Sequence, residues 1–236
     1  MGKFLFLLVF VLFLSNTLQA QKTMKIIYVY DALCGWCYGF SPVMEQFAAK
    51  HSAEAEFVVI SGGMVVGERI GAIGEVAPYI SWAYKEVENR TGVKFGQKFL
   101  DDVLKEGKTI FTSIPAAWAL SAFKTYQPQN SVAFASRLQK GVYWDGAAPL
   151  DYQHYGKMAA EFGINAEEFV KKMQTEEIQN LANQDFNYSS QLGVQGFPAV
   201  FLEKNGQYVF FANGYMDLAT LEQQFEQAKQ MLKMGN

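Results

Sequence analysis

The sequence predicts an α/β fold in which a long helical segment interrupts a small sheet. Three observations predict it: two short apolar strands near the start enclose a helix, a hairpin signal stands near the end, and residues 64–192 between them follow the helical period. The chain has 236 residues, a formal net charge of −3 and a hydrophobic share of 50%. This composition is typical of a folded globular protein. It gives no reason to expect nucleic acid as a partner, which would favour a basic surface.

Residues 1–20 are interpreted as a secretory signal peptide and are left out of the fold. Lys3 precedes an apolar run from Phe4 to Leu14, and a polar stretch follows that ends at Ala20. As a helix this run would rise about 16 Å, which is too short for a hydrocarbon core of about 30 Å. We therefore expect a periplasmic or otherwise exported protein with no stable membrane association after cleavage, whose cysteines meet an oxidising compartment. The alternative is an uncleaved membrane anchor.

Residues 24–63 predict the first part of the sheet. The segments "MKIIYVYDA" and "AEFVVISGG" have the Ile, Val and Tyr content of buried strands, and "CYGFSPVMEQFAAKH" between them has helical spacing. Pro42 is expected to kink this helix without ending it. Two strands joined by one helix form a βαβ unit, so the strands should pair in parallel.

Residues 64–192 predict an insertion built only of helices. The glycines of "GGMVVGERIGAIG" indicate a loop that enters it, without the spacing of a dinucleotide-binding motif. Asn165 and Glu168 form a capping pair ahead of one long helix, "FVKKMQTEEIQNLANQ", and Pro115 suits the first turn of another. The remaining expected helices are "APYISWAYKEV", "GQKFLDDVLKEG", "IPAAWALSAFKTY", "SVAFASRLQKGVYW" and "DYQHYGKMAAEFG".

Residues 193–236 predict the second part of the sheet. The segment "GVQGFPAVFLEKNGQYVFF" contains two strands around a turn at Asn205 and Gly206. A last helix from Asp217 places one apolar stripe on one face, formed by Leu218, Leu221, Phe225, Ala228 and Leu232. Without the insertion the order of elements is β-α-β then β-β-α. The predicted fold class is therefore α/β, a thioredoxin-like fold with a large all-helical insertion.

The chain has two cysteines, Cys34 and Cys37, both in "DALCGWCYGF". A zinc site needs four ligands, and the two histidines, His51 and His154, lack the paired spacing of a zinc motif, so no metal is expected. A structural disulfide across two residues would close a very small loop and remove little entropy from the unfolded chain. A working redox pair is the favoured interpretation.

The position of the cysteines before a helix supplies a mechanism for that pair. If Cys34 opens the helix, Cys34 and Cys37 share one face with Cβ atoms about 5–6 Å apart. The free N–H groups and positive partial charge of a helix N-terminus favour the thiolate of Cys34, while Cys37 would be shielded one turn further on. Asp31 could relay protons or could cap the turn before the helix, and the turn is the favoured interpretation.

Three segments resemble one known family. "YDALCGWCYGFSP" resembles the active-site region of DsbA-family thioredoxin-like proteins of the FrnE-like branch, through Asp31, Cys34, Trp36, Cys37 and Pro42. "TSIPAAWALSAF" is similar to a helix of the inserted domain of that family. "LGVQGFPAVF" is similar to the family's loop before a cis-proline, which would be Pro198. Together these segments extend over nearly all of the chain after the signal.

The resemblance implies a protein thiol-disulfide oxidoreductase of the oxidase or isomerase type. Cys34 would be the nucleophile, Cys37 the resolving thiol, and Pro198 would lie opposite the pair. Gly35, Trp36 and Phe197 would contact the substrate. The chain departs from the family at two of these positions, since the branch commonly has proline in place of Gly35, and a small or β-branched residue in place of Phe197. The reduction potential and the substrate preference therefore do not carry over.

The resemblance also implies the partners. These would be unfolded or reduced proteins and a further redox partner, with no cofactor besides the Cys34–Cys37 disulfide, and with glutathione as an external thiol. Two alternatives remain open: a glutathione-dependent isomerase or transferase of the same fold, and a non-catalytic peptide-binding adaptor or chaperone. Helical spacing predicts that most of the other large aromatic residues, Trp82, Trp118, Tyr143 and Trp144, are core, and that Trp36 alone lies at the surface near the sulfur.

Overall fold

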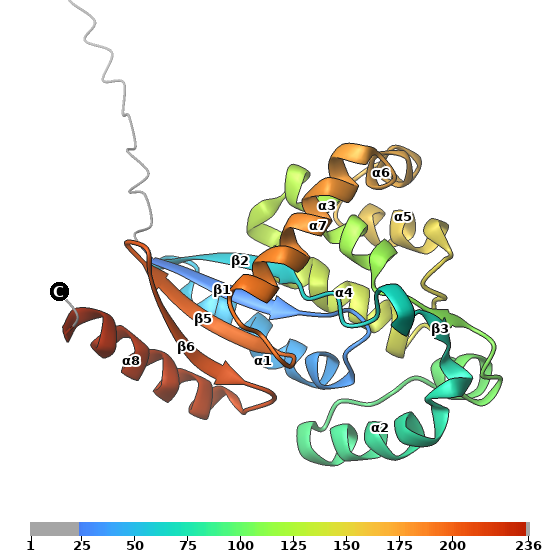
Figure 1. Ribbon diagram of the computed structural model, residues 1–236, viewed down its shortest axis with the longest axis horizontal. Coiled ribbons are helices and arrows are strands. Elements are labelled where there is room, and N and C mark those ends of the chain that lie inside the picture. Colours follow the sequence, from blue (N-terminus) through green and yellow to red (C-terminus); the bar gives the residue numbers. More distant parts are fainter. Residues whose placement is uncertain (1–23, 235–236) are drawn as a thin grey trace, which may run out of the picture.

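A four-stranded sheet forms the centre of the structure, a computed structural model that describes residues 24–234 (Figure 1). The strand order is β2-β1-β5-β6, with β1 at Met24–Tyr30, β2 at Ala55–Ser61, β5 at Ala199–Lys204 and β6 at Gln207–Asn213. β1 pairs in parallel with β2 and antiparallel with β5, and β5 pairs antiparallel with β6. This arrangement confirms the predicted thioredoxin-like sheet. The predicted signal peptide lies outside the described residues.

The described part of the chain has eight α-helices. They are α1 (Gly35–His51), α2 (Ala77–Thr91), α3 (Ile114–Tyr126), α4 (Ser131–Tyr143), α5 (Tyr152–Ala160), α6 (Ala166–Met173), α7 (Glu176–Gln191) and α8 (Leu218–Met234). A π-helix, Phe99–Lys105, follows α2. Between residues 24 and 234, no helix combines the length and the apolar character that a membrane crossing requires.

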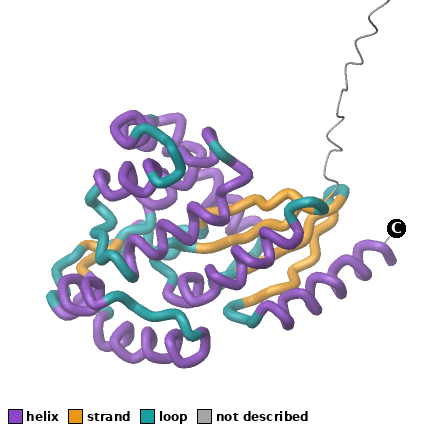
Figure 2. Tube along the Cα trace, turned by 180° about the vertical axis from the view of Figure 1, so that it is seen from behind, coloured by secondary structure: helices purple, strands orange, loops and turns teal. Residues whose placement is uncertain are grey.

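The two faces of β1 pack into separate apolar clusters, as the alternation of a strand requires. Ile26, Tyr28 and Tyr30 lie in the main core with residues of α1 and α8, whereas Ile27 and Val29 pack against residues of α7 and the loop after it. Figure 2, seen from behind, shows α8 alongside the sheet, and Figure 1 shows α2 at the lower margin, away from it. α7 falls within residues 64–192, so part of the segment interpreted as insertion covers one face of the sheet.

Pro42 lies inside α1, and the helix continues through it as predicted. Proline has no N–H, so the carbonyl of Tyr38 loses its usual donor four residues on. The hydroxyl of Ser41 donates to that carbonyl at 2.8 Å. This bond satisfies the group that the proline leaves free and lets one helix run from the cysteine pair to His51.

The insertion differs from the all-helical prediction in two places. A short antiparallel pair, β3 (Gly71–Ala72) with β4 (Ile110–Phe111), lies in part within the glycine-containing segment that was expected to be a loop. The prediction of one long helix after Asn165 is wrong, because this segment forms two helices, α6 and α7. Thr175 begins α7, and its hydroxyl accepts a hydrogen bond from the main chain of Ile178 at 3.5 Å.

Two local predictions are confirmed. The side chain of Asn165 caps α6 by accepting from the main-chain N–H of Glu168 at 3.0 Å. The hairpin turn has positive φ at both central residues, 54° at Asn205 and 78° at Gly206, which suits an Asn-Gly pair. These elements follow from residues close in sequence, and no tertiary contact is needed to explain them.

Candidate active site

The cysteine pair lies where β1 ends and α1 begins. Cys34 is the N-cap of α1, and its Sγ accepts a hydrogen bond from the main-chain N–H of Cys37 at 3.2 Å. Both cysteines are free thiols, with 5% of Cys34 and 0% of Cys37 exposed to solvent. An N–H directed at sulfur from the first turn of a helix stabilises a thiolate more than a thiol. Cys34 is therefore placed to carry the negative charge.

Cys37 has the opposite environment. Burial raises the pKa of the Cys37 thiol well above its ordinary value, and the hydrogen bond and charge of Cys34 raise it further. Cys37 consequently holds its proton more firmly than a free thiol does. The two sulfurs have the same chemistry in a free peptide, and their positions on the helix make them different.

The loop before β5 faces the pair from the other side. The Phe197–Pro198 peptide bond is cis, as the resemblance implied. The carbonyl oxygen of Phe197 lies 3.5 Å from Cys34 Sγ and accepts its thiol hydrogen. The ring of Phe197 lies over Gly62, where an added Cβ would come within 2.1 Å of a ring carbon. Gly62 therefore allows the close packing that holds Phe197 beside Cys34.

Asp31 directly follows β1 and is buried at the turn that leads to Cys34. Its carboxylate accepts from the main-chain N–H of Leu33 at 2.9 Å, from that of Met64 at 2.8 Å and from the Ser113 hydroxyl at 2.8 Å. Burial raises the pKa of the carboxyl above its ordinary value of 3.8, although these hydrogen bonds lower it. The bond to Leu33 agrees with the turn interpretation, and the bond to Ser113 ties the turn to the insertion.

Two side chains of α4 complete this support. The side-chain amide nitrogen of Gln139, which is fully buried, lies 3.4 Å from the main-chain oxygen of Asp31 and donates to it. The Tyr143 hydroxyl donates to the main-chain oxygen of Leu33. Sequence reasoning missed Ser113, Gln139 and Tyr143 as parts of the site. For the last two the available signal was a glutamine and a tyrosine four residues apart on one predicted helix.

A cavity of about 510 Å³ opens beside Cys34. Cys34, Gly35 and Trp36 line one side of it, so two of the three residues expected to contact substrate lie here, while the third, Phe197, lies on the other side of the sulfur. Trp36 is half-buried, as predicted for a residue near the surface, and the Arg90 guanidinium lies 5.4 Å from its ring centre.

The core interpretation of the other large aromatic residues is wrong for two of them. Trp82 is 62% exposed and Trp144 is 47% exposed, whereas Tyr143 is buried and Trp118 is partly buried. Helical spacing identifies the residues that share a face, and it does not show whether another element covers that face. For α2, which lies away from the sheet, part of that surface stays open.

The two histidines lie on different helices, His51 on α1 and His154 on α5, and each contacts a carboxylate. His51 contacts Glu222 at 3.0 Å and also Glu54, and His154 contacts Asp151 at 2.7 Å. Within residues 24–234, no three His, Cys, Asp or Glu side chains gather in positions that could hold a metal ion.

The fold and the sulfur pair define a thiol-disulfide oxidoreductase of the thioredoxin-like class. The chain belongs to the family of DSBA-like thioredoxin domains, whose family model matches residues 25–226. This match confirms the resemblance to the DsbA family. A search among curated proteins gives no match.

Several solved structures have the same fold over most of this chain. A candidate protein disulfide isomerase from Nitrosomonas europaea is 24% identical, with a TM-score of 0.77 over 89% of this chain and 98% of that one. The cytosolic disulfide reductase DsbM from Pseudomonas aeruginosa is 24% identical, with a TM-score of 0.71 over 89% and 99% of the two chains. A candidate DsbA oxidoreductase from Streptomyces coelicolor is 16% identical, with a TM-score of 0.63 over 88% of this chain and 90% of that one. At these identities the likeness establishes the shared fold.

Proposed function

We propose that this protein is exported and exchanges disulfides with unfolded or reduced proteins through Cys34 and Cys37. One observation carries the proposal: the Sγ of Cys34 accepts the N–H of Cys37 at the start of α1 and lies at the wall of a large cavity. The signal-like pattern of residues 1–20 supports export. The periplasm or another exported compartment would supply oxidising conditions.

In the oxidising direction, a substrate thiolate attacks Cys34 Sγ of the disulfide form. The Cys34–Cys37 bond breaks, a substrate–Cys34 disulfide forms, and Cys37 leaves as a thiolate that takes up a proton. Burial raises the pKa of Cys37, so this protonation is favourable. A second substrate thiolate then attacks the substrate sulfur of the mixed disulfide, which releases Cys34 as a thiolate. Two electrons pass from the substrate to the pair.

In the isomerising direction the reduced pair starts the reaction. The Cys34 thiolate attacks a substrate disulfide, forms a mixed disulfide and releases one substrate thiolate, which attacks another disulfide of the same chain. The thiolate freed in that exchange attacks the substrate sulfur bonded to Cys34, which forms a new substrate disulfide and releases the Cys34 thiolate. Cys37 is placed to release a substrate that stays attached, by attacking Cys34 Sγ in the mixed disulfide. In both directions Pro198 and Phe197 would border the substrate on one side of the sulfur, and Gly35 and Trp36 on the other.

The pair itself would be the redox group, with no further cofactor. A second redox protein would restore its oxidation state, and glutathione could serve as an external thiol. The Pseudomonas reductase of the same fold has been solved with GSH, which supports testing that thiol first.

Mixed-disulfide trapping tests the proposal. A Cys37→Ala variant, in reduced form, would be mixed with a peptide whose cysteine is bonded to thionitrobenzoate. Attack by Cys34 breaks that bond, joins the peptide to the protein and releases coloured thionitrobenzoate, which leaves easily because its thiol is acidic. We expect one peptide per protein, located on Cys34 by mass spectrometry, and no such adduct in a Cys34→Ala variant.

The other outcomes separate the alternatives. Absence of a Cys34 adduct would contradict the proposal. Peptide binding that is unchanged after replacement of both cysteines would favour an adaptor or chaperone. Activity on small electrophiles with glutathione that survives Cys37→Ala would favour the glutathione-dependent isomerase or transferase.

A further inference from the structure

Ser113 lies next to the turn before Cys34, and its hydroxyl is not used as its place in the sequence predicts. It directly precedes α3, at the N-cap position, where a serine side chain usually accepts a hydrogen bond from the first turn of the helix. The Ser113 side chain makes no such bond to α3, and 2% of the residue is exposed. The partner of this buried hydroxyl is instead the Asp31 carboxylate.

The direction of the Ser113 hydrogen bonds is fixed by its neighbours. The main-chain N–H of Val65 can only donate, and it donates to Ser113 Oγ at 2.9 Å. The single hydroxyl hydrogen is therefore free for Asp31 Oδ1, which lies 2.8 Å away. The main-chain N–H of Ser113 donates in turn to the main-chain oxygen of Val65 at 2.9 Å, so these two residues are joined twice.

The Asp31 carboxylate is surrounded by donors. Oδ1 accepts from the main-chain N–H of Leu33 at 2.9 Å and from the Ser113 hydroxyl, and Oδ2 accepts from the main-chain N–H of Met64 at 2.8 Å. A carboxylate can accept all three bonds, whereas a carboxyl proton would compete with these donors. Within residues 24–234, no lysine, arginine or histidine forms an ion pair with Asp31. The charge of Asp31 therefore depends on its hydrogen bonds.

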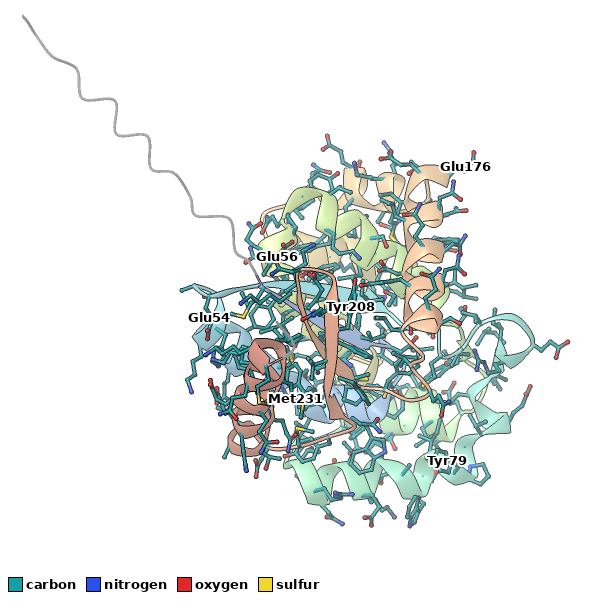
Figure 3. All side chains as sticks on the ribbon, turned by 60° about the vertical axis from the view of Figure 1, so that its left-hand side comes forward. Glu54, Glu56, Tyr79, Glu176, Tyr208 and Met231 are labelled. Atoms are coloured by element: carbon teal, nitrogen blue, oxygen red, sulfur yellow. The ribbon has the colours of Figure 1, made fainter. Side chains whose placement is uncertain are left out.

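Burial acts against these donors. Carboxylates such as those of Glu56 and Glu176 lie at the surface in Figure 3, whereas 2% of Asp31 is exposed. Burial raises the pKa of the Asp31 carboxyl, and the hydrogen bonds from its donors lower it. Loss of the Ser113 hydroxyl would remove one of these opposing bonds. The pKa of Asp31 would then rise, and the carboxyl would take up a proton at a higher pH.

Asp31 also contacts the cysteine pair. Its main-chain oxygen accepts from the N–H of Cys34 at 3.1 Å. Burial raises the pKa of the Cys37 thiol most, Cys34 raises it further and the charge of Asp31 adds to this, while a hydrogen bond with the Asp31 main chain lowers it. An ionised Asp31 therefore helps Cys37 to hold its proton, and a neutral Asp31 does not.

The other titratable groups that feel the charge of Asp31 are three buried tyrosines, Tyr30 after the core of β1, Tyr143 on α4 and Tyr155 on α5. Burial raises the pKa of each hydroxyl above its ordinary value of 10.0, and the charge of Asp31 raises it further. All three are therefore neutral near neutral pH. None of them can replace the charge of Asp31 beside Cys37.

We propose that Ser113 is a positioning residue for disulfide exchange: by donating to Asp31 it keeps that carboxylate charged beside Cys37, and it thereby sets the pH at which Cys37 resolves a mixed disulfide. The proposal rests on the proposed exchange reaction at Cys34 and adds a residue that controls its resolving step. In that step Cys37 gives its proton to the solvent, and its sulfur attacks Cys34 Sγ. The Cys34–Cys37 bond forms, the bond between Cys34 and the substrate sulfur breaks, and the substrate leaves as a thiolate that takes up a proton.

The pH dependence of the resolving step tests this role. The reduced protein would be mixed with a thionitrobenzoate-bonded cysteine peptide, and the coloured release would follow the attack by Cys34. Release of the free peptide thiol, measured by chromatography of acid-quenched samples from about pH 5 to about pH 9, would follow the attack by Cys37. We expect a lower midpoint in Ser113→Ala than in the wild type, with release at least about threefold faster below the wild-type midpoint.

Ser121→Ala is the matched control. Ser121 lies on the same helix and is 1% exposed, and in the part of the chain that the structure describes its hydroxyl has no hydrogen-bond partner. Its removal should leave the pH profile unchanged. Asp31→Asn, which cannot carry the charge, should move the midpoint in the same direction as Ser113→Ala, and the double variant should show no further shift. Asp31→Asn carries the test if thermal unfolding shows that Ser113→Ala does not fold.

A merely structural role of Ser113 gives a different result. Loosening of the turn would slow both steps at every pH and leave the midpoint in place, which would overturn the proposal. An unmoved midpoint in Asp31→Asn would overturn it as well, and so would a further shift in the double variant, because Ser113 would then act without Asp31. In each of these cases a normal Cys34 adduct in the Cys37→Ala protein leaves the exchange reaction in place. Absence of that adduct would contradict the exchange reaction itself.

Discussion

We interpret residues 24–63 with 193–236 as a scaffold and residues 64–192 as an insertion, and residues of both lie around Cys34. The scaffold supplies Cys34, Cys37 and the Phe197–Pro198 bond, all within two short segments. The insertion supplies Ser113, which holds the Asp31 carboxylate, and α2, which encloses the cavity. The comparison indicates that the scaffold carries the sulfur chemistry, while the insertion holds the turn before Cys34 in place and encloses the cavity beside it.

Replacement of the scaffold sulfurs should have the largest effect. Cys34→Ser should reduce disulfide exchange to the uncatalysed rate, because no other thiol lies at the helix N-terminus. Cys37→Ser should still form the mixed disulfide but release it slowly, which mass spectrometry would detect as an accumulated adduct. Thermal unfolding would verify that both variants fold. A Cys34→Ser protein with normal exchange would contradict the central role of this sulfur.

Gly62→Ala should be the next largest change, and it lies on the scaffold side. The added Cβ would come within 2.1 Å of the Phe197 ring, so the ring and its main chain must move away from Cys34. We expect a loss of about 1–3 kcal/mol in the free energy of unfolding and slower exchange.

Gly196→Ala is the matched control, because its Cβ would meet no atom within 4 Å. Urea unfolding and exchange rates of the two variants would separate packing against Phe197 from general loop effects. Equal behaviour of both variants would show that this packing does not position Phe197.

The pH dependence of stability should report on Asp31, where scaffold and insertion meet. Because burial raises the folded-state pKa above 3.8, folding binds protons, and this contribution is present below pH 3.8 and is lost as the pH rises through the folded-state value. Asp31→Asn cannot titrate. The unfolding free energy of the wild type, minus that of the variant, should therefore fall as the pH rises from about 3 toward about 7. A flat difference in urea unfolding would contradict a raised pKa.

Glu222→Gln should have the smallest effect, because Glu222 takes no part in the site around the sulfurs. Its carboxylate pairs with His51 and Lys50. Burial opposes its ionisation, but hydrogen bonds from Lys50 and His51 lower the pKa of Glu222 below its ordinary value of 4.5. Its stabilisation is present above pH 4.5 and is lost as the pH falls through the folded-state value. We expect a loss of less than about 1 kcal/mol at neutral pH and unchanged exchange rates. Slower disulfide exchange in Glu222→Gln would contradict this prediction and would show that the Glu222–His51 contact affects the cysteine pair.

The sequence was sufficient for features that depend on neighbouring residues. The spacing of Cys34 and Cys37 before a helix, the Asn165 cap and the Asn205–Gly206 turn all involve contacts over a few positions. The split between α6 and α7 was also accessible, since Thr175 followed by two glutamates has the pattern of a helix start. The hydrophobic period continued across this point and concealed it.

The remaining parts of the site depend on contacts between distant residues. Ser113 contacts Asp31 although the two residues are 82 positions apart in the sequence. Gln139 and Tyr143, both on α4, bind the main chain of the same turn. The hydrophobic period shows which face of a helix such a residue lies on, but it does not show which residue of another element it contacts. The cavity is the clearest case, since its walls come from the start of α1, the segment after β2, α2 and the more distant Phe95, Phe111 and Tyr143. The exposure of Trp82 follows from where α2 packs.

The reduction potential of the Cys34–Cys37 couple, measured by equilibration with glutathione buffers, tests the central claim most directly. A working redox pair predicts a couple that these buffers oxidise and reduce reversibly, with a potential between about −270 and about −120 mV. A couple that stays oxidised in every buffer, with a potential below about −300 mV, would contradict it and would indicate a structural disulfide.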